Sequence, residues 1–143
     1  MSGANYLGIW VLVPELCIYQ KGDPPISGKY TISGDESEIH FRIDWTDIEG
    51  TDHKLEFGGE LNGTPQEVVA PGITGVAYEK VDDNTLDSTA YVNADIVMYA
   101  RRAVSWRKDL LAVSQVSYTP DGNFSNFQVY RREPSYMFPA ETG

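Results

Sequence analysis

Strict alternation of apolar and polar residues constrains this chain more than any other feature of its sequence. Over eight positions the two kinds take turns, in the order Glu38, Ile39, His40, Phe41, Arg42, Ile43, Asp44 and Trp45. Successive side chains of a β-strand point to opposite faces of the sheet. The pattern therefore predicts a strand with one face on a core and the other in water.

Similar apolar runs, rich in β-branched and aromatic residues, recur at short spacing with turn residues between them. Asn62-Gly63 is a hairpin signal, because both residues tolerate the positive φ of a type I′ turn. A helical turn is expected only within 14–20. The predicted strands are 7–13, 28–33, 37–46, 53–61, 64–70, 73–81, 86–92, 96–106, 110–119 and 124–132.

A long run of sequential hairpins leaves two exposed edge strands unless the sheet closes on itself. We therefore expect an all-β fold, an antiparallel up-and-down meander of about 8–10 strands closed into a barrel. A β-sandwich is the alternative, because strand patterns alone do not determine which strands pair. The expected barrel domain covers 7–133, between an N-terminal tail at 1–6 and a C-terminal tail at 134–143.

The charge and composition exclude several classes of partner. A formal net charge of −10 over 143 residues disfavours nucleic acid, because few cations are present to replace the counterions of a phosphate backbone. No apolar run is long enough for insertion into a membrane. Cys17 is the only cysteine, so no intrachain disulfide forms.

The first residues lack the basic and apolar regions of a secretion signal. As written, the sequence predicts a cytoplasmic protein, and export of a trimmed precursor is left open.

Two motifs at opposite ends of the predicted domain are similar to a known group. The first predicted strand contains Gly8-Ile9-Trp10, and the last contains Val129-Tyr130-Arg131-Arg132. This pairing resembles the calycins, which include lipocalins and fatty-acid-binding proteins, where a Gly-x-Trp closes the barrel base and a late Arg packs across the indole. The resemblance implies a barrel plug made of Trp10 and Arg131.

A second similarity covers roughly residues 60–132. Its segments are 62–65 (Asn-Gly-Thr-Pro), 78–85 (Tyr-Glu-Lys-Val-Asp-Asp-Asn-Thr), 102–105 (Arg-Ala-Val-Ser), Asp121-Gly122 and 129–131. In this order they resemble small uncharacterised bacterial lipocalin-like proteins, which implies a fold and no particular ligand. Fatty-acid-binding proteins end with an inward Arg-x-Tyr, whereas the matching positions here are Gln128 and Tyr130.

Arg102 is the most informative polar residue. It is in phase with the apolar members of its predicted strand, in the order Ile96, Met98, Ala100, Arg102, Val104 and Trp106. If this face is internal, Arg102 is a buried cation that holds the anionic group of a ligand, pairs with an internal carboxylate, or extends to the rim.

Gln128 and Tyr130 form a polar stripe that either faces solvent or lines the interior together with Arg102. The candidate ligand-binding residues are Arg102, Tyr130, Gln128, Trp106, Met98, Phe41 and Trp45.

No arrangement of residues points clearly to catalysis or to a metal. His40 reads as a solvated strand residue and His53 as part of a turn, and the acidic loop near Asp47 lacks the spacing of a calcium loop. We expect no cofactor and no metal. The predicted function is noncatalytic binding of a small hydrophobic or amphipathic molecule inside the barrel.

Two alternatives to noncatalytic binding are left open. One is a barrel enzyme acting on a small hydrophobic substrate, with Glu79 as acid or base. The other is a β-domain for protein association. The sequence leaves the oligomeric state open.

Overall fold

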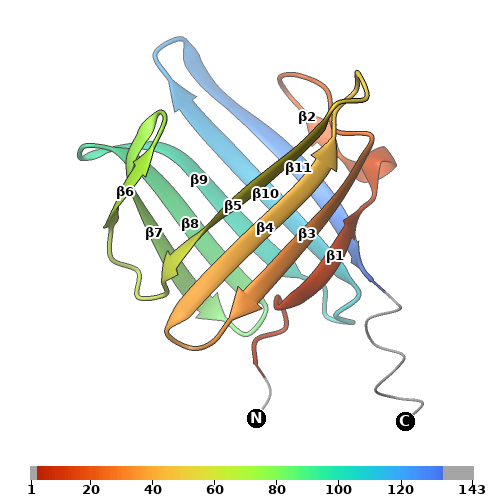
Figure 1. Cartoon of the computed structure of the whole chain (residues 1–143), viewed down its shortest axis with the longest axis horizontal. Coiled ribbons are helices and arrows are strands. Elements are labelled where there is room, and N and C mark those ends of the chain that lie inside the picture. The colour runs from red at the N-terminus through yellow and green to blue at the C-terminus, as the bar shows by residue number, and fades with distance from the viewer. Residues whose placement is uncertain (1–2, 134–143) are drawn as a thin grey trace.

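A computed structural model describes residues 3–133. Eleven strands and one short 3-10 helix make up this part of the chain (Figure 1). In order they are β1 (Gly8–Leu12), η1 (Pro14–Leu16), β2 (Ile18–Tyr19), β3 (Ser27–Gly34), β4 (Glu38–Thr46), β5 (Asp52–Glu60), β6 (Gln66–Ala70), β7 (Ile73–Asp82), β8 (Thr85–Val92), β9 (Asp95–Val104), β10 (Leu110–Thr119) and β11 (Gly122–Arg132).

The strands form one antiparallel sheet in the order β5-β4-β3-β1-β11-β10-β9-β8-β7-β6, and β2 adds to β11. Because β1 pairs with both β3 and β11, the beginning and the end of the meander are joined. The sheet curls into a nearly closed barrel (Figure 1). The predicted all-β meander is confirmed, and the sandwich alternative is wrong. No helix within residues 3–133 is long and apolar enough to cross a membrane.

Each predicted strand corresponds to an observed one, and most bounds differ by one or two residues. The expected helical turn is the three-residue η1, and it is followed by β2, which the sequence pattern did not predict. β9 ends at Val104, so Trp106 belongs to the following turn.

The barrel has two unlike ends. The closed end carries the turns at 35–37, 61–65, 83–84 and 105–109, and the open end carries those at 47–51, 71–72, 93–94 and 120–121. Near the closed end the inward side chains are buried, among them Trp10, Ile32, Ile39, Leu86, Val104 and Leu111. Toward the open end the inward side chains are only partly covered, and Leu55 is about half exposed. A register shift between β8 and β9 pairs Ile96 with Tyr91, which turns Ile96 to the outer face.

A cation covers the plug at the closed end. Trp10 is fully buried, and the guanidinium carbon of Arg132 lies 4.1 Å from the centre of its ring. Arg132 stands opposite Trp10 in the β1–β11 register, whereas Arg131 stands opposite Val11 and is exposed. The prediction of Arg131 as the plug cation was therefore wrong by one residue, which in a strand means the opposite face.

Gly8 leaves the space that this arrangement needs. A Cβ atom at Gly8 would lie 2.8 Å from Nη1 of Arg132, and its φ of 138° is one that other residues rarely adopt. Arg132 also donates to the backbone oxygens of Asn5, Leu7 and Lys108. The Gly-x-Trp motif and this late arginine thus form one unit.

The segment expected to be an N-terminal tail takes part in the core. Tyr6 is 1% exposed, and its backbone oxygen accepts the indole N–H of Trp10 at 3.0 Å. The barrel domain therefore includes Tyr6. Residues 1–2 and the predicted C-terminal tail at 134–143 lie outside the described residues.

The barrel is not closed by backbone pairing between β5 and β6. Instead, the amide side chain of Gln66 accepts from the N–H of Glu60 at 2.9 Å and donates to its carbonyl oxygen at 2.7 Å. The side chain thus replaces one residue of a neighbouring strand at the end of β5. We call the gap between β5 and β6 the seam.

Candidate functional site

The inward face of β9 contains Ala100, Arg102 and Val104, all buried. The register across β8 and β10 places Arg102 opposite Leu86 and Val113, which belong to the same interior. The apolar residues of β9 therefore turn Arg102 inward, as their alternation indicates. Arg102 is 4% exposed and is the only charged residue among the buried ones described.

Neutral groups surround this guanidinium. Its Nε donates to the Tyr30 hydroxyl at 2.8 Å, and Nη1 donates to the Ser88 hydroxyl at 3.0 Å. Its carbon lies 4.5 Å from the centre of the Phe41 ring. Within residues 3–133 it has no carboxylate within 4.0 Å, and Nη2 makes no hydrogen bond. We call Arg102, Tyr30, Ser88 and Phe41 the anchor cluster.

Two of the readings of Arg102 drawn from the sequence are therefore wrong. The guanidinium does not pair with an internal carboxylate among the described residues, and its burial excludes a position at the solvent-exposed rim. Its role as an anchor for a ligand stays a prediction.

A chain of polar groups on β11 borders the anchor cluster. Tyr130 is 3% exposed, lies edge-on to Tyr30 with ring centres 5.4 Å apart, and donates to Gln128 at 3.1 Å. The Gln128 amide donates in turn to the Tyr19 hydroxyl. The polar stripe on β11 therefore lines the interior, and the solvent-facing alternative is wrong.

Apolar side chains line the barrel between this polar group and the open end. Phe57 stacks on Phe41 at 4.7 Å, and Trp45 stacks on His53 at 5.1 Å. At the rim of the open end, a shallow hollow of about 410 Å³ is lined by Trp45 and His53 and by polar residues that include Lys29, Asp44 and Asp52. The interior is therefore polar near Arg102 and apolar between Arg102 and the open end.

The predicted ligand-binding residues fall into three groups. Arg102, Tyr130, Gln128 and Phe41 belong to one connected set of contacts. Met98 and Trp45 are half-buried on the same inner face, nearer the open end.

Trp106 does not join them. It is 79% exposed in the turn after β9, where Arg107 lies over its ring at 5.0 Å. Its inclusion was wrong, because the strand ends before its alternation reaches position 106.

Sequence reasoning missed Tyr19, Tyr30 and Ser88 as site residues. Tyr19 reaches Gln128 from β2, a two-residue strand too short to show a period. Ser88 is in phase with Leu86 and Ala90 on β8, so its alternation carried a signal that the residue is internal. Their hydroxyls complete the polar lining around Arg102 and Gln128.

Burial changes the acidity of two internal phenols. Loss of hydration raises the pKa of Tyr78 to about 12, and it raises the pKa of Tyr130 as well. Phe41 lies between Tyr78 and the anchor guanidinium, with its ring 5.6 Å from that of Tyr78. The folded barrel therefore favours uncharged phenols next to the Arg102 cation.

This shift predicts a loss of stability in alkali. The unfolded chain begins to ionise its tyrosines near pH 10, whereas folded Tyr78 stays protonated until about 12. The free energy of unfolding should therefore fall between these values, by up to about 1.4 kcal/mol per pH unit from Tyr78. Urea unfolding at several pH values should show a shallower fall for Tyr78→Phe, and the half-exposed Tyr118→Phe should fall like the wild type. Equal slopes for all three proteins would contradict the shift.

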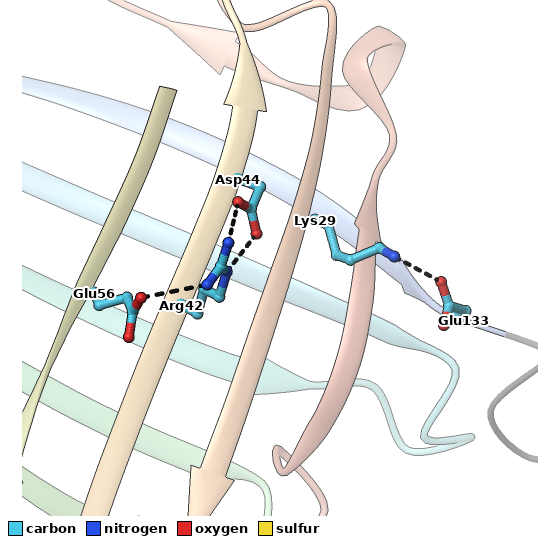
Figure 2. Close-up of polar contacts among 5 residues, drawn as sticks. All are labelled: Lys29, Arg42, Asp44, Glu56 and Glu133. Carbon is cyan, nitrogen blue, oxygen red and sulfur yellow. Dashed lines mark hydrogen bonds and ion pairs between the residues drawn. The ribbon is translucent and has the colours of Figure 1, made fainter. Parts of the chain in front are cut away.

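The other polar groups that the sequence singled out lie outside the barrel or at its rim. Figure 2 shows Arg42 on the outer face, 2.9 Å from Asp44 and 3.3 Å from Glu56. Glu79 is exposed on the outer face of β7. His53 lies at the rim, 2.8 Å from Asp47. Within residues 3–133, no three His, Cys, Asp or Glu side chains are arranged to hold a metal ion.

Comparison with known proteins supports the architecture. No family model and no curated protein matches the chain. Among solved structures 22 chains match, including one described as "The Siderocalin Ex-FABP functions through dual ligand specificities". That match has a TM-score of 0.52 at 11% identity and covers 94% of this chain and 77% of the other. With its Gly8, Trp10 and Arg132 plug and its nearly closed meander, the chain has a calycin-like, lipocalin-type β-barrel fold.

Proposed function

We propose that this protein binds a small amphipathic molecule inside its barrel, with the acidic group of that molecule on Arg102. The observation that carries the proposal is a buried guanidinium that only neutral groups contact. The Tyr30 and Ser88 hydroxyls satisfy two donors but do not neutralise the charge. A carboxylate or phosphate would do both, because it accepts charge-assisted hydrogen bonds from the guanidinium fork.

Burial removes water from the Arg102 guanidinium. A cation taken out of water loses several kcal/mol of hydration, on the order of magnitude found for buried ions. The aromatic rings of Phe41 and Tyr30 recover part of this loss. An anionic ligand would recover more, and it would find the free Nη2 donor.

The apolar lining suits the remainder of such a ligand. Phe57, Trp45 and Met98 line the interior toward the open end, and Leu55 is left about half exposed there. Covering this surface with a hydrocarbon chain would be favourable at roughly 25 cal/mol per Å². The arrangement supports a ligand that enters from the open end with its acidic group first.

A matched pair of ligands tests this proposal. A fluorescent fatty acid and its methyl ester share the same chain and differ in charge at one end. We expect the acid to bind at least about tenfold more tightly, as a charge-assisted hydrogen bond implies. Native mass spectrometry of protein purified from its own host would identify a retained ligand. Equal affinity for acid and ester would refute the proposed role of Arg102.

A further inference from the structure

The edge of β5 along the seam has unpaired backbone groups. β5 pairs only with β4, and the contact that crosses the seam by hydrogen bonds is at its last residue, Glu60. The N–H and the carbonyl of Glu60 point into the seam, and those of alternate residues in a strand point the same way. Lys54, Glu56 and Gly58 therefore direct both backbone groups into the seam without a described backbone partner.

This edge is also accessible. Residues 52–56 are exposed, and Leu55 is 49% exposed although its side chain points inward. β5 is bound to β6 at the Glu60 end, and Figure 1 shows it running away from β6 toward the open end. Such an edge accepts another extended strand.

We infer that a second copy of this chain occupies the edge, with β5 pairing antiparallel to β5 of its partner. A two-fold axis beside Leu55 places Leu55 opposite itself and Lys54 opposite Glu56 of the second copy. In this register the seam-facing groups of 52, 54, 56 and 58 meet those of the partner, and none of the groups already bonded to Gln66 is needed.

Charge favours this register. On the outer face, Lys29 of β3, Asp44 of β4 and Lys54 of β5 lie in one row across the sheet. Glu56 and Arg42, joined at 3.3 Å, lie in the next row (Figure 2). Pairing about Leu55 joins the first row of one copy to the second row of the other. Positive and negative side chains then alternate along the joined row across the interface.

Three nearby registers are less favourable. An axis at Glu56 sets two glutamates opposite each other, and an axis at Lys54 sets two lysines opposite each other, which destabilises strand pairs. An axis at Phe57 requires the backbone of Glu60, which Gln66 already holds. The inference is independent of the proposed ligand.

Sedimentation equilibrium from low to several hundred micromolar tests the dimer. We expect the wild type to be dimeric and Lys54→Glu to dissociate about tenfold more readily, because two like-charge contacts replace two opposite ones. Glu56→Pro should be monomeric, because proline lacks the N–H that points into the seam at position 56. The hydrogen bonds to β4 should survive, because the odd-numbered residues of β5 make them. Lys21→Glu, exposed and distant, should behave as the wild type. A monomeric wild type at the highest concentration would overturn the inference.

Cross-linking tests the register independently of affinity. In a Cys17→Ser background, Leu55→Cys places two thiols opposite each other within the range of a disulfide, so oxidation should give a covalent dimer. Phe57→Cys is the matched control on the same inner face, and its thiol would face His53 of the partner subunit. Faster cross-linking of the Leu55 variant supports the proposed pairing. Equal rates, or a preference for the Phe57 variant, overturn it.

Discussion

Replacing Arg102 with methionine is expected to weaken binding of a fatty-acid probe by about 1.5–3 kcal/mol, the usual size of a hydrogen-bonded contact to a charged group. Methionine keeps the length and the apolar stem of arginine but removes the cation and its donors. Affinity for the methyl ester should change little, because the ester makes no charged contact. Fluorescence titration of both probes against both proteins measures this difference directly.

The stability of the ligand-free protein gives a second measurement on the same variant. Arg102 has no described carboxylate partner, so the substitution leaves no buried anion unpaired. It removes hydrogen bonds to Tyr30 and Ser88 and also removes a desolvated charge, and we expect these effects to offset each other within about 1.5 kcal/mol.

Arg101→Met is the matched control for Arg102→Met. Arg101 points to the outer face and bonds Asp87 at 2.8 Å and 2.9 Å, so its loss should leave both affinities unchanged. Equal losses for acid and ester in Arg102→Met would refute the anchor role.

The strands were predictable because alternation is a direct consequence of strand geometry. Ile39, Phe41, Ala100 and Val104 point inward, as their period of two indicates. The same reasoning identified Arg102 as internal. It failed at Trp106, because periodicity does not show where a strand stops and Lys108 then takes a left-handed φ of 68° in the turn.

The details of the site depended on contacts between distant segments. Tyr19 reaches Gln128 across a sequence separation of 109 residues, and Tyr30 reaches Arg102 across 72. No local pattern encodes such a separation. The choice between Arg131 and Arg132 depended on the β1–β11 register, because a shift of one residue reverses the face.

The missing backbone pairing between β5 and β6 could not be predicted from the local sequence pattern either. β5 and β6 are consecutive and joined by a hairpin-like segment, for which the sequence predicts ordinary pairing. In the structure the Gln66 side chain takes the place of a backbone partner at Glu60. Gly59 permits this contact, since a Cβ there would lie 2.5 Å from Oε1 of Gln66.

Truncation of the closed-end plug should have the largest effect on stability. Trp10→Ala is expected to lower the free energy of unfolding by about 3–5 kcal/mol, as for other buried aromatic residues cut to alanine. The indole is fully buried, its N–H bonds the Tyr6 carbonyl, and its ring face contacts Arg132, so a cavity, an unpaired acceptor and a lost cation–π contact arise together. Because Arg132 also holds the backbone of Asn5 and Leu7, the N-terminal segment should loosen as well, which hydrogen exchange would detect.

Trp106→Ala provides the matched control for Trp10→Ala, because it removes the same side chain from a position that is 79% exposed. Its free energy of unfolding should change by no more than about 0.5 kcal/mol, as at other exposed sites. Urea unfolding followed by far-UV circular dichroism compares the two variants without relying on tryptophan emission. A loss below about 1 kcal/mol for Trp10→Ala would show that the indole is not the plug, since a buried aromatic truncation cannot be so mild in a close-packed core. Trp10→Ala could also lower the free energy of unfolding by about 3–5 kcal/mol while the amide exchange rates of Asn5 and Leu7 stay unchanged. That result would show that the indole stabilises the core by packing and that Arg132 holds the N-terminal segment independently of it.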